Sequence, residues 1–200
     1  MLTSPWDLVL TALFAVTGVW CAIDLLAHRS RSRTADGAIT SHTIIDINHL
    51  VMSAAMILMI WVTVIDAVTW AQVAVFAVFA VALIPGLFGR EEVTRRVSLV
   101  GHIALNAAMV WMLLAMPLLM AGMEMSEGDT SGHHGGDTGV MPTSTPPWAD
   151  ALNWLFVALS AAAALWWIAT LIRSRGRHLH DLCYAAMGAG MALMLVVMNA

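Results

Sequence analysis

Six long apolar stretches alternate with short polar segments along this chain. They cover about residues 6–27, 44–65, 67–88, 97–121, 149–172 and 179–198. A helix needs about 20 mainly apolar residues to cross a hydrocarbon layer of about 30 Å. The pattern therefore predicts an all-α polytopic membrane protein, with six transmembrane helices in a single membrane domain over residues 1–200.

Basic residues are confined to alternate connections between these stretches. The positive-inside rule places connections rich in arginine in the cytoplasm. Both termini are then expected outside the cell, together with the longest connection, residues 122–147. The nine basic residues are Arg29, Arg31, Arg33, Arg90, Arg95, Arg96, Arg173, Arg175 and Arg177.

Composition agrees with a membrane protein and removes several functional classes. Hydrophobic residues make up 60% of the chain and charged residues 11%, where soluble domains are nearer a quarter charged. The absence of lysine excludes a P-loop lysine and a lysine Schiff base. No basic tract with interleaved aromatics suggests nucleic acid, and no Gly-x-Ser-x-Gly or His-Glu-x-x-His motif suggests a hydrolase. We therefore expect a protein that is not an enzyme and whose surroundings are the lipid bilayer.

One motif occurs in the second, fourth and sixth apolar stretches. It consists of a histidine, four variable residues and Ala-Ala-Met, and it begins at His49, His102 and His180. Each copy follows an inward-running stretch and an arginine-rich connection. Three hairpins, at about residues 6–65, 67–121 and 149–198, are therefore predicted to share a common ancestry and a pseudo-threefold axis along the membrane normal.

Methionines are concentrated in the same three stretches. The first, third and fifth stretches contain none beyond the initiator. At 100° per residue, the methionines of each outward-running helix stay within an arc of roughly 100° on the side of its histidine. They are Met52, Met56 and Met59, then Met109, Met112, Met116 and Met120, and finally Met187, Met191, Met194 and Met198.

We call the methionine-bearing side of each of these helices a methionine stripe. If the three stripes face one another, their sulfur atoms form successive layers of soft ligands through the membrane. Thioether sulfur is an uncharged soft ligand that suits copper(I). Weak sites in series are what conduction requires. We therefore predict a copper(I)-handling membrane protein, acting in transport or delivery. The candidate metal ligands are His49, Met52, Met56, Met59, His102, Met109, Met112, Met116, His180, Cys183, Met187, Met191 and Met194.

Other interpretations of these residues stay open. Methionine is a flexible apolar filler, so the stripes are also explained by packing in a structural subunit of a larger membrane complex. Two of the three motif histidines are suitable axial ligands for haem b in a haem or quinone-linked electron carrier. The 122–147 connection holds Met123, Met125, His133, His134 and Met141, which are either capture ligands or parts of an ordinary glycine-rich linker.

Two resemblances extend this interpretation. Met-x-x-x-Met pairs such as Met52/Met56 and Met187/Met191, with histidines and Cys183 at the cytoplasmic end, resemble copper transporters of the Ctr type, whose trimeric pore is lined by such pairs. Here the six helices lie in one polypeptide and no cytoplasmic Cys-His tail is present. The chain also resembles a family of small actinobacterial membrane proteins of unknown function. The resemblance lies in its size, in the His…Met motif, and in Trp6 followed by the sequence Gly-Val-Trp-Cys at residues 18–21. That resemblance implies a bacterial plasma membrane. The copper(I) prediction suggests a membrane cuproenzyme as a partner, and the structural-subunit interpretation suggests a larger membrane complex.

Overall fold

The described part of the chain is helical. The computed structural model describes residues 6–31, 41–61, 66–88, 92–120, 146–174 and 179–198. No strand occurs within these ranges. The elements are α1 (Trp6–Arg31), α2 (Ser41–Trp61), α3 (Asp66–Leu83), the 3-10 helix η2 (Ile84–Leu87), α4 (Val93–Met120), α5 (Pro147–Arg173) and α6 (Leu179–Met198).

Five of these helices are long and apolar enough to cross a membrane. They contain Thr43–Trp61, Ala67–Leu87, Val93–Met116, Pro147–Arg173 and His180–Met198. The apolar part of α1, Leu8–Ile23 among the described residues, is shorter. The described residues thus confirm the prediction of a helical protein with several helices that could span a membrane, while a complete membrane crossing by α1 stays a prediction.

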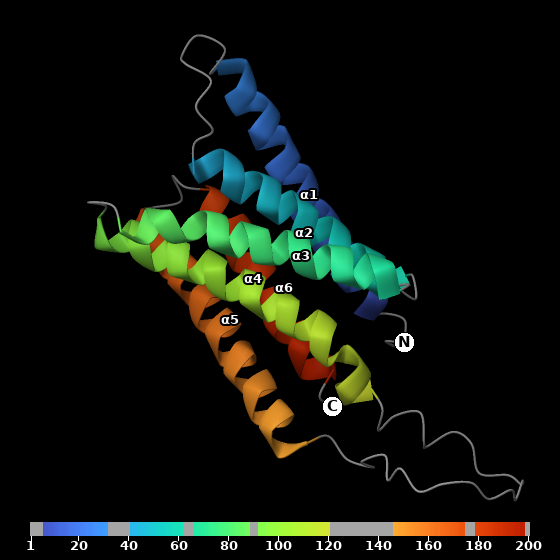
Figure 1. Ribbon diagram of the computed structural model, residues 1–200. Helices are drawn as coiled ribbons and strands as arrows, with labels where there is room; N and C mark the ends of the chain where they lie inside the picture. Colours follow the sequence, from blue (N-terminus) through green and yellow to red (C-terminus); the bar gives the residue numbers. More distant parts are fainter. Residues whose placement is uncertain are drawn as a thin grey trace, which may run out of the picture.

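The helices run in alternating directions and pack most extensively with their neighbours in sequence. Figure 1 shows α1, α3 and α5 running one way and α2, α4 and α6 the other. The closest pairs are α5 with α6, α1 with α2, and α3 with α4. Because α2, α4 and α6 run the same way, the histidines near their starts lie toward one end of the bundle, which we call the histidine end.

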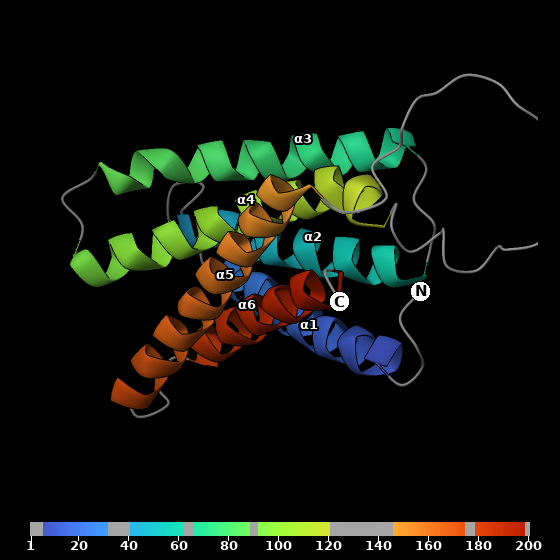
Figure 2. The same ribbon diagram turned by 90° about the horizontal axis from the view of Figure 1, so that it is seen from below.

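The methionine-bearing helices are also the most buried. Half of the apolar span is buried in α2 and α4 and 44% in α6, against 11% in α3 and 22% in α5. In Figure 2, α3 lies on one side of the bundle and α1 with α6 on the other, with α2 and α4 between them. The sulfur-rich faces therefore belong to the interior of the bundle.

Small residues let neighbouring helices approach closely. A Cβ added to Gly188 would lie 3.2 Å from the backbone oxygen of Ser160 and 3.2 Å from Cβ of Ala164, both on α5. One added to Gly190 would lie 2.9 Å from the ring of Phe14 on α1. Close backbone approach at small residues is the usual way in which membrane helices gain packing energy, since lipid tails remove the hydrophobic drive for association.

Tryptophan side chains join helices through hydrogen bonds. Trp61 Nε1 donates to Thr11 Oγ1 at 2.9 Å, and so joins α2 to α1. Trp167 Nε1 donates to Ser98 Oγ at 3.1 Å, which joins α5 to α4. The indole of Trp167 is 1% exposed, so its bond satisfies an N–H that would otherwise be costly to bury.

Several helix ends differ from the predicted boundaries. Arg29 and Arg31 belong to α1, Arg95 and Arg96 to α4, and Arg173 to α5, although all five were predicted in connections. Arginine is a good helix former, and a cation is favoured at a helix C-terminus, as for Arg173. The third stretch ends earlier than predicted, since Pro85 at the start of η2 replaces the α-helix by a 3-10 turn.

Some predictions fall outside the described residues. These are residues 62–65, predicted as the end of the second stretch, and most of the 122–147 connection with Met123, Met125, His133, His134 and Met141. Arg33, Arg90, Arg175 and Arg177 lie outside as well.

Candidate functional site

Two histidines from different hairpins meet inside the bundle. His49 on α2 and His102 on α4 are each 1% exposed. His49 Nε2 lies 3.1 Å from His102 Nδ1, and the two ring centroids are 5.0 Å apart, edge to face. We call these two residues the histidine pair. Polar side chains at such depth in membrane spans are costly and usually functional.

Aromatic rings enclose the histidine pair. The ring of Tyr184 on α6 stacks on His49, with centroids 4.8 Å apart, and meets His102 edge-on at 4.7 Å. The indole of Trp167 on α5 lies 4.9 Å from the His102 ring. Four helices thus contribute to this arrangement, whose walls are rings with electron-rich faces.

The third motif histidine is not part of the pair. His180 is half-buried, and its ring centroid lies 6.4 Å from that of Tyr184. Cys183, another predicted metal ligand, is half-buried as well. Within the described ranges, no three His, Cys, Asp or Glu side chains are grouped so that they could hold a metal ion. The structure therefore brings together two of the three motif histidines, and a metal-binding role for any of them stays a prediction.

Most of the predicted methionine ligands lie in one buried cluster. Their burial follows from the helical register, because each stripe lies on the buried side of its helix. Met116 is half-buried and is not in this cluster. The members, which we call the methionine cluster, are Met52, Met56, Met59, Met109, Met112, Met187, Met191 and Met194, with exposures from 0% to 8%.

Buried amides lie next to both histidines. Asn106, one turn after His102, donates from Nδ2 to the carbonyl oxygen of His102 at 2.8 Å. Its Oδ1, and both amide atoms of Asn48, have no hydrogen-bond partner among the described residues. Asn48 is 1% and Asn106 0% exposed. The histidine end therefore adds buried amides to the imidazoles, beside the sulfur-rich methionine cluster.

Sequence reasoning missed Tyr184 and Trp167. Tyr184 is the only tyrosine of the chain and stands directly before the Ala-Ala-Met of the third motif. Ser53 and Asn106 occupy the same place in the other two copies, and all three are buried. A buried polar residue four positions after each motif histidine was thus a readable signal. Trp167 had none, since it is one of nine tryptophans.

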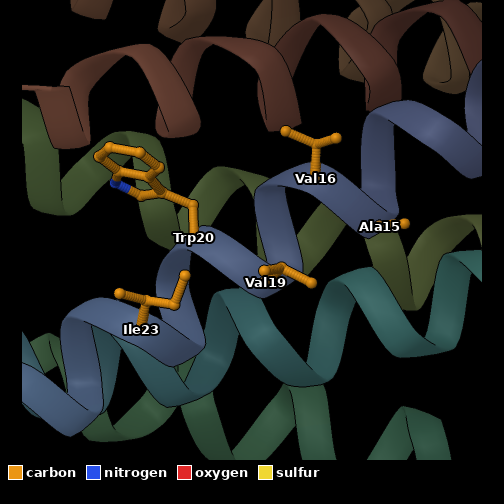
Figure 3. Close-up of a pocket in the computed structure, with 5 residues that line it drawn as sticks. All are labelled: Ala15, Val16, Val19, Trp20 and Ile23. Carbon is orange, nitrogen blue, oxygen red and sulfur yellow. The ribbon is translucent and has the colours of Figure 1, made fainter.

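A surface depression on α1 is separate from this site. It is lined by Ala15, Val16, Val19, Trp20 and Ile23, all on one helix (Figure 3). Its lining is almost wholly apolar, and most of these side chains are exposed. Such a face suits contact with lipid and offers no ligands for a metal.

Comparison with known proteins gives one match. The sequence model of a family described as a domain of unknown function, DUF5134, matches residues 41–198. The matched region contains α2 to α6 and therefore the histidine pair, the methionine cluster, Tyr184 and Trp167. No curated protein and no solved structure matches the chain.

Proposed function

Because the chain belongs to the DUF5134 family, a domain of unknown function, we propose its function from the site itself: the protein handles copper(I) inside the membrane. The methionine cluster is the binding path, and the histidine pair lies at its cytoplasmic end. The cargo is passed across the bilayer or delivered to a membrane cuproenzyme. The membrane is a bacterial plasma membrane, with both termini outside, and the three hairpins are related by a pseudo-threefold axis.

The observation that carries this proposal is the shared burial of the methionine faces. Three helices from three hairpins direct eight methionines into one cluster, while the other described helices contribute none to it. Packing alone does not require this segregation, because leucine fills such positions equally well in membrane helices.

The chemistry of the cluster suits a soft monovalent cation. Thioether sulfur needs no deprotonation, and it selects copper(I) over harder divalent ions. Successive members on one helix are separated by three or four residues, which corresponds to rises of about 4.5 to 6 Å between sulfur levels. Levels at this spacing support transfer from one weak site to the next.

The geometry of the histidine pair is less suited to haem. A bis-imidazole haem needs a flat macrocycle between its two axial rings. Here the rings form a hydrogen bond at 3.1 Å, and Tyr184 and Trp167 lie against them. A single small ion requires far less rearrangement than a macrocycle, which favours the copper proposal over the electron carrier.

Removing one level of sulfur tests the proposal. Met56, Met109 and Met187 are each 0% exposed and stand seven residues after their histidines. Changing all three to leucine should weaken copper(I) affinity at least about 10-fold, a loss that even indirect ligand changes produce. The measurement is competitive copper(I) titration of purified protein under reducing conditions.

The fold of the variant is checked separately. Met to Leu nearly conserves volume and should cost less than about 1.5 kcal/mol at each position. A thermal melt of the metal-free protein provides this control. Unchanged copper affinity in a folded triple variant would show that the methionines only fill space.

A further inference from the structure

We propose a second copper(I) site formed by the histidine pair alone, in which one ion bridges His49 Nε2 and His102 Nδ1. This inference deepens the proposed function and rests on it for the supply of copper(I). The methionine cluster binds through sulfur, whereas this site binds through two imidazole nitrogens from different helices. The two sites therefore differ in a way that spectroscopy can separate.

The geometry requires only a small change. The two nitrogens already face each other at 3.1 Å. Two metal–nitrogen bonds of about 2 Å in line need about 4 Å between the nitrogens. The rings would therefore separate by about 1 Å, which small changes in the side-chain torsions of His49 and His102 can provide.

The number of ligands selects the ion. Zinc in proteins takes four ligands, at least three of them normally from protein. In the part of the chain that the structure describes, no third His, Cys, Asp or Glu completes such a set. Monovalent copper and silver, with filled d shells, accept two ligands in line. Two neutral imidazoles facing each other thus suit copper(I) and not zinc.

The surroundings of the pair favour a cation and limit other ligands. Ring faces of Tyr184 and Trp167 lie 4.8 and 4.9 Å, centroid to centroid, from His49 and His102 respectively. Such faces attract a cation and exclude water at the same time. Asp46, one turn before His49 on α2, is 4% exposed and brings a carboxyl group to the same end of the bundle.

Binding leaves the proton count unchanged. Each neutral imidazole carries one N–H, and one of these protons lies between His49 Nε2 and His102 Nδ1 in the empty pair. When the ion enters, this proton moves to the other nitrogen of the same ring, and both facing nitrogens offer lone pairs. Copper stays in the +1 state, and the hydrogen bond between the rings is replaced by the two metal–nitrogen bonds.

X-ray absorption of the copper(I)-loaded full chain tests the site. The wild type should show a nitrogen shell at about 2 Å beside a sulfur shell at about 2.3 Å. His49→Leu should lose the nitrogen shell and keep the sulfur shell. His180→Gln is the matched control, because it removes the equivalent histidine of the third repeat, which lies outside the pair, and it should keep both shells.

The outcomes separate the two proposals. A wild-type spectrum with sulfur alone, or a nitrogen shell that persists in His49→Leu, overturns the histidine site and leaves the methionine proposal standing. A wild-type spectrum with nitrogen alone supports the histidine site and overturns the methionine path.

A measurement on the unaltered chain covers the case in which His49→Leu does not fold. Silver(I) added to protein labelled with ¹⁵N at histidine should shift Nε2 of one histidine and Nδ1 of another together. Unmoved histidine signals at saturating silver would overturn the proposal.

Discussion

At the scale of single residues, the core differs along its length. The histidine end brings together the histidine pair and the amides of Asn48 and Asn106, and the methionine cluster supplies sulfur. The motif histidines were visible in the sequence, but their pairing was not, because three equivalent positions give no reason for two to meet and one to remain half-buried. The asymmetry comes from residues that differ between the repeats, above all Tyr184, which contacts both rings of the pair.

The bond from Trp167 to Ser98 holds one wall of the histidine pair in place. Ser98→Ala removes the acceptor of this bond. The indole N–H of Trp167, a side chain that is 1% exposed, then loses its hydrogen-bond partner Ser98. We expect the free energy of unfolding in mixed detergent to fall by about 1 kcal/mol, since membrane-buried hydrogen bonds typically contribute about 0.6 and at most about 1.7 kcal/mol.

Ser174→Ala is the matched control for this change. The Ser174 hydroxyl donates only to the carbonyl of Leu171 in its own helix, at 3.0 Å, so its loss should be nearly neutral. Equal stability of the two variants would mean that the Trp167 bond contributes nothing to the fold.

At the scale of helices, periodicity gave most of what is found. The methionine stripes predicted which face of α2, α4 and α6 is buried, because burial in a bundle follows the 3.6-residue period. Helix ends were less predictable, since arginine continues a helix beyond the apolar stretch, as Arg95 and Arg96 do in α4. The close approach of α5 and α6 could not be predicted either, because the position of a glycine in the sequence does not reveal which neighbouring helix it packs against.

Gly188→Ala tests that approach. The added methyl group would meet the backbone of Ser160 and the side chain of Ala164, neither of which can move as a flexible chain end does. We expect a loss of about 1 to 3 kcal/mol in the free energy of unfolding, as for overpacked cores.

Ala189→Leu provides the comparison on the same helix. Ala189 is exposed on the bundle surface, so the larger side chain should meet lipid or detergent and change stability little. A Gly188→Ala protein as stable as this control would contradict tight packing of α5 on α6.

At the scale of the whole molecule, composition and hydropathy predicted the class, and the family match agrees with the expectation of a family of unknown function. Sidedness and the threefold relation stay predictions, since arginine placement and motif recurrence are their only support. The proposed copper(I) path is likewise supported by the chemistry of the side chains that fill the core.

The most direct test of this central claim is the number of sulfur ligands around copper(I) in the unaltered protein. The cluster should give two or three sulfur neighbours at about 2.3 Å in the X-ray absorption spectrum, since soft copper(I) selects thioether sulfur. Copper held only by nitrogen or oxygen, or washed away entirely by a weak chelator, would contradict the account.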